Sequence, residues 1–141
     1  MRPRDTHVKT VLTVALLTVA LASCSSAEER TLLAQFFAAS RLRDLTAVHN
    51  VATVAFEPAT DGIVTNFEVV RITVVQASGG QATRKDVLIS APVKLFDGRT
   101  VSKEFVVTMQ RGLPGSDQSR AGGWMITAFK ADPASASTPR P

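Results

Sequence analysis

Few side chains in this sequence could carry out acid–base chemistry. His49 is the one histidine after residue 23, and histidine titrates closest to neutral pH. As a general base it would have to point into a pocket. It could instead lie on the polar side of a helix, and we favour that interpretation. Glu68 and Glu104 fall in predicted strands, on faces that fit contact with solvent better than burial. These three residues are the pocket candidates, and we predict no catalytic residue.

Other kinds of site lack the residues they need. One cysteine, one histidine after residue 23 and carboxylates without ligand spacing do not make a metal site. Gly79-Gly80 and Gly122-Gly123 are predicted turns, and neither belongs to a phosphate-binding loop. We interpret Arg84 and Lys85 as solvated charges rather than as an anion site. We therefore expect no metal, and no cofactor other than a covalent lipid on Cys24.

Composition and charge limit the class of protein. The chain of 141 residues is 45% hydrophobic and 20% charged, which excludes a wholly disordered or fibrous protein. Its formal net charge is +4, but the first 23 residues hold three basic residues and one acidic residue, so the remainder carries +2. Nucleic-acid binding needs more positive charge, clustered on one face. We expect no nucleic-acid partner, and a single domain in the remaining 118 residues.

Residues 1–23 have the layout of a secretory signal. Arg2, Arg4 and Lys9 precede the uncharged and largely apolar stretch Val11–Ala22. Twelve helical residues rise about 18 Å, whereas the core of a bilayer is about 30 Å thick. The stretch is therefore too short for a permanent transmembrane helix, and we expect it to be removed.

The signal ends in Leu21, Ala22, Ser23 and Cys24, which resembles the bacterial lipobox. The resemblance implies recognition of the first three residues by the signal peptidase, cleavage before Cys24, diacylglycerol on its thiol and a further acyl chain on the new amine. Several acyl chains make a lasting anchor. Ser25 stands where an aspartate would imply retention in the inner membrane, so we expect the outer membrane, facing the periplasm. An ordinary secretory signal cut near Ala22 or Ser23 is the alternative.

These observations divide the chain into four parts. They are a removed signal peptide (1–23), a lipidated tether (24–27), one α+β domain (28–130) and a disordered tail (131–141). The tail contains three prolines and no aliphatic side chain larger than alanine, so it has too little apolar surface to fold.

The first part of the domain has the apolar spacing of helices. Residues 28–40 form one amphipathic helix, and two overlapping capping boxes, Ser25 with Glu28 and Ser26 with Glu29, favour its start. After a polar break over residues 40–43, Asp44 is expected to cap a second helix that ends near Val51. The residues expected to face inward are Leu32, Leu33, Phe36, Phe37, Leu45, Val48, Val51 and Ala52.

From Asp61-Gly62 onward the apolar period is two, which predicts strands. Residues 63–75 form one long strand, with a bulge near Val69-Val70 that reconciles its two faces. Residues 78–80 form a turn, and 124–130 form the closing strand. Pro92 cannot donate to a neighbouring strand, which argues for a bulge or an edge at that position.

Two of the predicted strands meet at Phe96-Asp97-Gly98. A two-residue loop at Asp97-Gly98 would place apolar residues opposite polar ones. A three-residue loop aligns the apolar faces and puts Gly98 at the left-handed third position that such loops require. We therefore predict the register Val93–Val101, Ile89–Phe105, Val87–Val107, Ser90–Glu104 and Lys94–Thr100.

The predicted order is two N-terminal helices followed by long antiparallel strands. The marked sequence features are Phe36-Phe37-Ala38-Ala39, Arg43-Asp44-Leu45, Phe67-Glu68-Val69, Phe96-Asp97-Gly98-Arg99 and Trp124. Together they resemble the nuclear-transport-factor-2-like, or cystatin-like, superfamily. The resemblance implies an α+β fold in which two helices pack on a curved antiparallel meander of about four strands, shaped as a cone.

Members of that superfamily include pocket enzymes and non-catalytic modules. The enzymes use a carboxylate base inside the cone, often with a tyrosine donor, and this sequence has no tyrosine. We therefore predict a lipid-anchored periplasmic lipoprotein that acts as a binding or assembly module, with a protein partner in the cell envelope. The alternative is a pocket enzyme, or a carrier of a small apolar ligand, with the same cone.

Overall fold

The computed structural model describes residues 26–113 and 121–132. The predicted signal peptide, Cys24, Ser25 and the tail beyond Asp132 lie outside these residues. The helices are α2 (Ala27–Leu42), α3 (Leu45–His49), α4 (Pro58–Asp61) and the 3₁₀ turn η1 (Ala121–Gly123). The strands are β1 (Ile63–Val64), β2 (Glu68–Ser78), β3 (Gln81–Lys94), β4 (Thr100–Arg111) and β5 (Trp124–Ala131).

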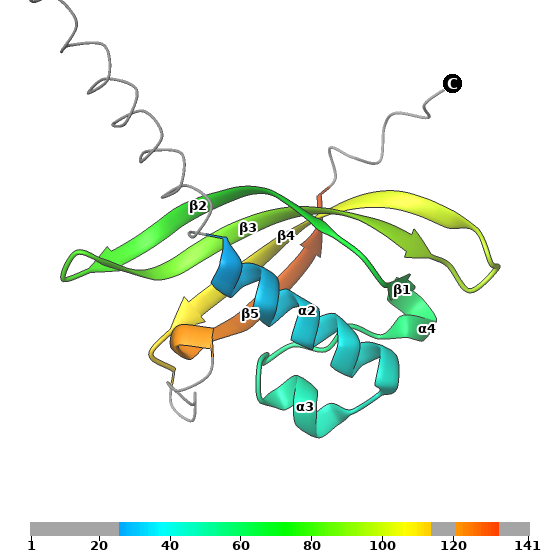
Figure 1. Cartoon of the computed structure of the whole chain (residues 1–141), viewed down its shortest axis with the longest axis horizontal. Helices are drawn as coiled ribbons and strands as arrows, with labels where there is room; N and C mark the ends of the chain where they lie inside the picture. The colour runs from blue at the N-terminus through cyan, green and yellow to red at the C-terminus, as the bar shows by residue number, and fades with distance from the viewer. Residues whose placement is uncertain (1–25, 114–120, 133–141) are drawn as a thin grey trace, which may run out of the picture.

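The strands form one antiparallel sheet that curls into a half-barrel. β2, β3, β4 and β5 are neighbours in chain order, and the short β1 pairs with the end of β3 beyond β2. Figure 1 shows α2 lying along the inner side of this curl, with α3 and α4 near its C-terminal end. The α+β cone expected from the sequence is confirmed, with α4 and β1 as additional short elements.

α2 buries the predicted apolar stripe. Leu32, Leu33, Phe36 and Phe37 are each at most 2% exposed. The helix continues through the predicted polar break, because Ser40 turns its hydroxyl back to the carbonyl oxygen of Phe36 at 2.8 Å. It ends where Arg43 adopts the left-handed conformation, with φ of 55°.

The start of α2 differs from the prediction. Ser26 is the N-cap residue, but its side chain makes no capping hydrogen bond. Glu29, the predicted partner in the capping box, is buried and bonded to Lys85 of β3. The Ser26–Glu29 box is therefore wrong, because the sheet supplies a stronger partner for this carboxylate than the helix end does. The Ser25–Glu28 box involves a residue outside the described part.

α3 begins as predicted but is shorter. The Asp44 carboxylate accepts a hydrogen bond from the Ala47 N–H at 3.0 Å, so the cap is confirmed. Val48, Val51 and Ala52 are buried, whereas Leu45 is 59% exposed, so its inward placement is wrong. One turn of helix has one inward face, and Leu45 at the first helical position lies off that face.

The predicted strand over residues 63–75 is two strands. β1 pairs with Val93 and Lys94, and β2 begins opposite Ser90, so the chain leaves the sheet between them. Pro92 pairs with Ser102 of β4 on one side and falls opposite this gap on the other, so β3 is an interior strand with a local edge at this position. The predicted bulge is also confirmed, since the register shifts between Val69 and Arg71.

The β3–β4 hairpin has the predicted register, from Lys94–Thr100 to Val87–Val107. Leu95 N–H donates to the Arg99 carbonyl at 2.7 Å, which closes the three-residue loop. Gly98 has φ of 86°, as that loop requires. The Arg99 backbone N–H, and then its guanidinium, hold the pKa of Asp97 below its ordinary value.

Gly98→Val is expected to lower the free energy of unfolding by about 1–2 kcal/mol, because a β-branched residue is strained at positive φ. The melting temperature should fall by several degrees in a thermal scan. Asp97→Ala removes only exposed hydrogen bonds to Arg99 and should cost less. A Gly98→Val protein that melts with wild type would contradict this account of the loop.

Candidate functional site

Phenylalanine side chains fill the inner side of the curled sheet. Each of the six rings lies between 4.8 and 6.4 Å from at least one other ring of the group, measured between centroids. The group, called here the phenylalanine cluster, consists of Phe36, Phe37, Phe56, Phe67, Phe105 and Phe129. Val87, Ile89, Val93 and Val107 of the sheet are fully buried beside it. These side chains form the apolar core between α2 and the sheet.

Among the hollows of the described part of the chain, three lie around this interior. One of about 460 Å³ is lined by Ala38 and Leu42 of α2 and Ala47 of α3. A second of about 350 Å³ is lined by Leu45, Phe56 and Pro58. The third, of about 160 Å³, borders Lys103 and three rings of the phenylalanine cluster. Each of the three is lined in part by residues of α3 or α4.

Two of the three pocket candidates share one face of the sheet, because Glu68 of β2 and Glu104 of β4 both pair with Ser90 of β3. His49 is exposed at the last position of α3. Glu68 is exposed at the first position of β2, and Glu104 is partly exposed on β4, opposite Ser90. None of the three lines any of the hollows described above. The structure thus brings Glu68 and Glu104 to either side of Ser90 and leaves His49 on α3.

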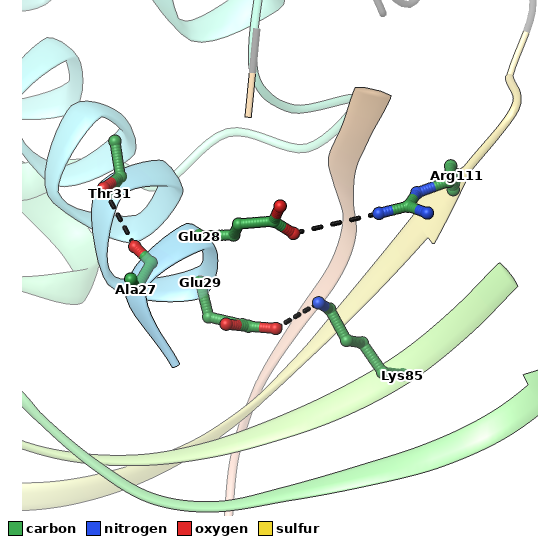
Figure 2. A network of polar contacts seen from close by, with 6 residues as sticks. All are labelled: Ala27, Glu28, Glu29, Thr31, Lys85 and Arg111. Carbon is green, nitrogen blue, oxygen red and sulfur yellow. Dashed lines mark hydrogen bonds and ion pairs between the residues drawn. The ribbon is translucent and has the colours of Figure 1, made fainter. Parts of the chain in front are cut away.

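A buried ion pair joins the start of α2 to β3. Glu29 is 3% exposed, and its Oε1 accepts a hydrogen bond from the Nζ of Lys85, which is 5% exposed. The same ammonium lies 3.8 Å from the centroid of the Trp124 ring. Figure 2 shows the carboxylate reaching from the first turn of α2 to the strand that carries Lys85.

A second pair lies beside the first and is nearer to solvent. The Arg111 guanidinium carbon is 4.5 Å from the Trp124 ring centroid, and Arg111 Nη2 is 3.8 Å from Glu28 Oε2 (Figure 2). A side chain at Gly122 would approach Arg111 Nη2 to 3.2 Å, so the turn before β5 packs closely on this pair. Lys85 and Arg111 thus both contact the Trp124 ring, and each of these cations is paired with a glutamate.

These five residues, called here the polar cluster, are Glu28, Glu29, Lys85, Arg111 and Trp124, and they join the first turn of α2 to the sheet. Among the described residues, Glu29 Oε2, Arg111 Nε and Trp124 Nε1 are buried without a hydrogen-bond partner. The geometry fastens the head of α2 to β3 and to the β4–β5 end of the sheet.

The interpretation of Lys85 as a solvated charge is wrong, whereas Arg84 is exposed as expected. Lys85 lies on the same face of β3 as Val87 and Ile89, and Glu29 lies on the stripe of α2 that buries Leu32. The sequence therefore contained a signal for this ion pair: Glu29 falls on the inward face of the helix and Lys85 on the inward face of the strand. The alternation of β3 predicts this placement two residues before Val87.

Comparisons with other proteins do not assign the chain to a family. No protein-family model matches the chain, and no curated protein or solved structure is significantly similar to it. In the described ranges, no three His, Cys, Asp or Glu side chains are grouped so as to hold a metal ion. No helix in those ranges has the length and apolar character required to cross a membrane.

Removing one partner of the buried pair is expected to be strongly destabilising. Glu29→Leu leaves the Lys85 ammonium buried without a counter-charge, and Lys85→Met leaves the carboxylate; each should lower the free energy of unfolding by about 3–5 kcal/mol. The double variant should recover most of this loss, because two apolar side chains of similar volume leave no charge unpaired. Urea unfolding measures all three variants.

Glu28→Gln is the matched control. Its side chain is 54% exposed, so losing the contact with Arg111 should change stability by less than about 1 kcal/mol. A double variant whose loss equals the sum of the two single losses would show that Glu29 and Lys85 do not stabilise each other.

Proposed function

We propose that the chain is a lipid-anchored lipoprotein of the periplasm, held in the outer membrane through Cys24, and that its cystatin-like domain is a non-catalytic binding or assembly module. The observation that carries the non-catalytic part is the phenylalanine cluster on the inner side of the sheet. A cone enzyme or a carrier of small apolar ligands needs that space open.

The arrangement of ionisable groups supports the same proposal. Glu29 and Lys85 are the buried charged residues in the described part of the chain, and they are bonded to each other. A general base needs a pocket in which its substrate can approach. None of the three candidate bases, His49, Glu68 and Glu104, lines any of the three hollows described above.

The position of α2 gives the proposed anchor a structural consequence. α2 begins at Ala27, three residues after Cys24, so the tether spans about 10 Å at most. The sixteen residues of the helix extend about 24 Å from that point. The polar cluster at the head of α2 would therefore lie near the membrane. Leu42 and Leu45, which are 79% and 59% exposed, would lie at the far end of the helix.

An assembly module must offer apolar surface outside its own core. Large exposed apolar residues in the described part occur in four places: Leu42 and Leu45 at the α2–α3 turn, Ile63 on β1, Phe96 at the tip of the β3–β4 hairpin, and three valines on β2. The last set lies on an open sheet edge, where backbone groups are also free to pair.

Acylation of Cys24 tests the anchor directly. Wild-type protein expressed in a Gram-negative host should incorporate labelled palmitate and partition into the detergent phase of a cloud-point extraction. Cys24→Ser should incorporate no label, because it lacks the thiol that accepts the lipid. Ser25→Ala retains the thiol and serves as the matched control. Wild-type protein that stays unlabelled, and enters the aqueous phase as Cys24→Ser does, would contradict the proposal.

A further inference from the structure

The two long edges of the sheet differ in whether another segment of the described chain pairs with them. Along β5, Ile126 donates its N–H to the Val51 carbonyl at 2.9 Å and accepts from the Thr53 N–H at 2.9 Å. Residues 51–53 thereby cover part of that edge as a parallel bridge. β2 pairs with β3 on one side and, within the described residues, with no strand on the other. Figure 1 shows β2 as the outermost long strand at this side of the curl.

The open edge is apolar at its centre. Val70, Val74 and Val75 of β2 are 52%, 56% and 49% exposed. An exposed edge with β-branched apolar side chains is a template for another strand. Proteins commonly protect such edges with charges, and between Val69 and Val75 the only charged residue is Arg71.

The sequence of this edge is nearly palindromic. Residues 69–75 read Val-Val-Arg-Ile-Thr-Val-Val, with Ile72 at the centre and two valines on each side. A symmetric dimer requires a surface that is complementary to itself. When two antiparallel β2 strands are related by a two-fold axis at Ile72, Val69 faces Val75, Val70 faces Val74 and Ile72 faces Ile72.

Neighbouring registers are less favourable. An axis at Arg71 would set two guanidinium groups directly opposite each other, and like charges at such positions destabilise a sheet. An axis at Thr73 would place Arg71 opposite Val75 and Val70 opposite Gln76. With the axis at Ile72, Arg71 faces Thr73 and Glu68 faces Gln76, so no like charges are directly opposed.

The bulges of β2 are compatible with this register. The pairing with β3 shifts between Val69 and Arg71 and again between Val74 and Gln76. The regular stretch between them, Arg71–Val74, contains Ile72. The two residues without a partner on β3, Val70 and Val75, lie on opposite sides of Ile72 within the palindrome, so in the antiparallel pair each bulge faces the region of the other chain's bulge.

We propose that β2 is a self-association edge, on which a second copy of this chain adds its own β2 antiparallel about a two-fold axis at Ile72. The two sheets join into one, and both copies of α2 lie on the same side of it, because residues opposite each other in a sheet share a face. Pairing two copies also closes the edge, so the assembly stops at a dimer. This inference goes beyond the proposed function and does not depend on the lipid anchor.

Disulfide cross-linking tests the register. The full chain with Cys24→Ser contains no cysteine, so single cysteines can be introduced on β2 without background. Chains carrying Val70→Cys and Val74→Cys are mixed and oxidised, and the dimer band is followed on a non-reducing gel. The mixture should cross-link at least about tenfold faster than either variant alone, since only the mixture places two cysteines opposite each other, within the ~7 Å limit for Cα atoms.

The single variants are matched controls with the same substitution on the same edge. In the proposed dimer the two Val70 positions lie about 14 Å apart, and so do the two Val74 positions, which is too far for a disulfide. Ile72→Cys alone should cross-link with itself, at the symmetry axis. Equal rates for the two single variants and their mixture, or no cross-linking in any sample, would overturn the proposal. Because lipidation is read separately by palmitate labelling, the two results cannot be confused.

Discussion

Aromatic packing between α2 and the curled sheet is the interaction on which this fold depends. Phe36 and Phe37 enter from the helix, and the other rings of the phenylalanine cluster come from the sheet and its connections. Full burial of one such side chain contributes about 1.5–3 kcal/mol, and ring pairs add to this. A flat sheet would leave part of this surface in water, so the curl and the helix stabilise each other.

The polar cluster fixes where along the sheet the helix sits. Apolar packing tolerates small shifts, whereas the contact between Glu29 Oε1 and Lys85 Nζ requires one position of the helix start relative to β3. Replacing such a pair by apolar side chains is often neutral for stability. We therefore attribute to it the alignment of α2, rather than most of the folding free energy. Trp124 places the last strand, β5, in the same alignment through its contacts with Lys85 and Arg111.

Strands with a regular alternation of apolar residues were predicted correctly from the sequence. Which of two possible partners a side chain binds was not. The β3–β4 register followed from alternation, because a slip of one residue would reverse every side chain. Glu29 pairs with Lys85, which is 56 residues away in the sequence, and a capping rule considers only residues within one helical turn. Leu45 was misplaced because a one-turn helix is too short for its periodicity to select a face. The break between β1 and β2 similarly reflects Pro92 on the neighbouring strand.

The central claim is that the inner side of the sheet is filled, and benzene binding tests it most directly. A small apolar ligand that enters a cavity of the native state raises the melting temperature in proportion to its binding. The account predicts no shift for wild-type protein at saturating benzene, and a shift for Phe36→Ala, in which the cavity is created. A stabilisation of the wild-type protein as large as that of the variant would contradict it, and would identify the domain as an open apolar container.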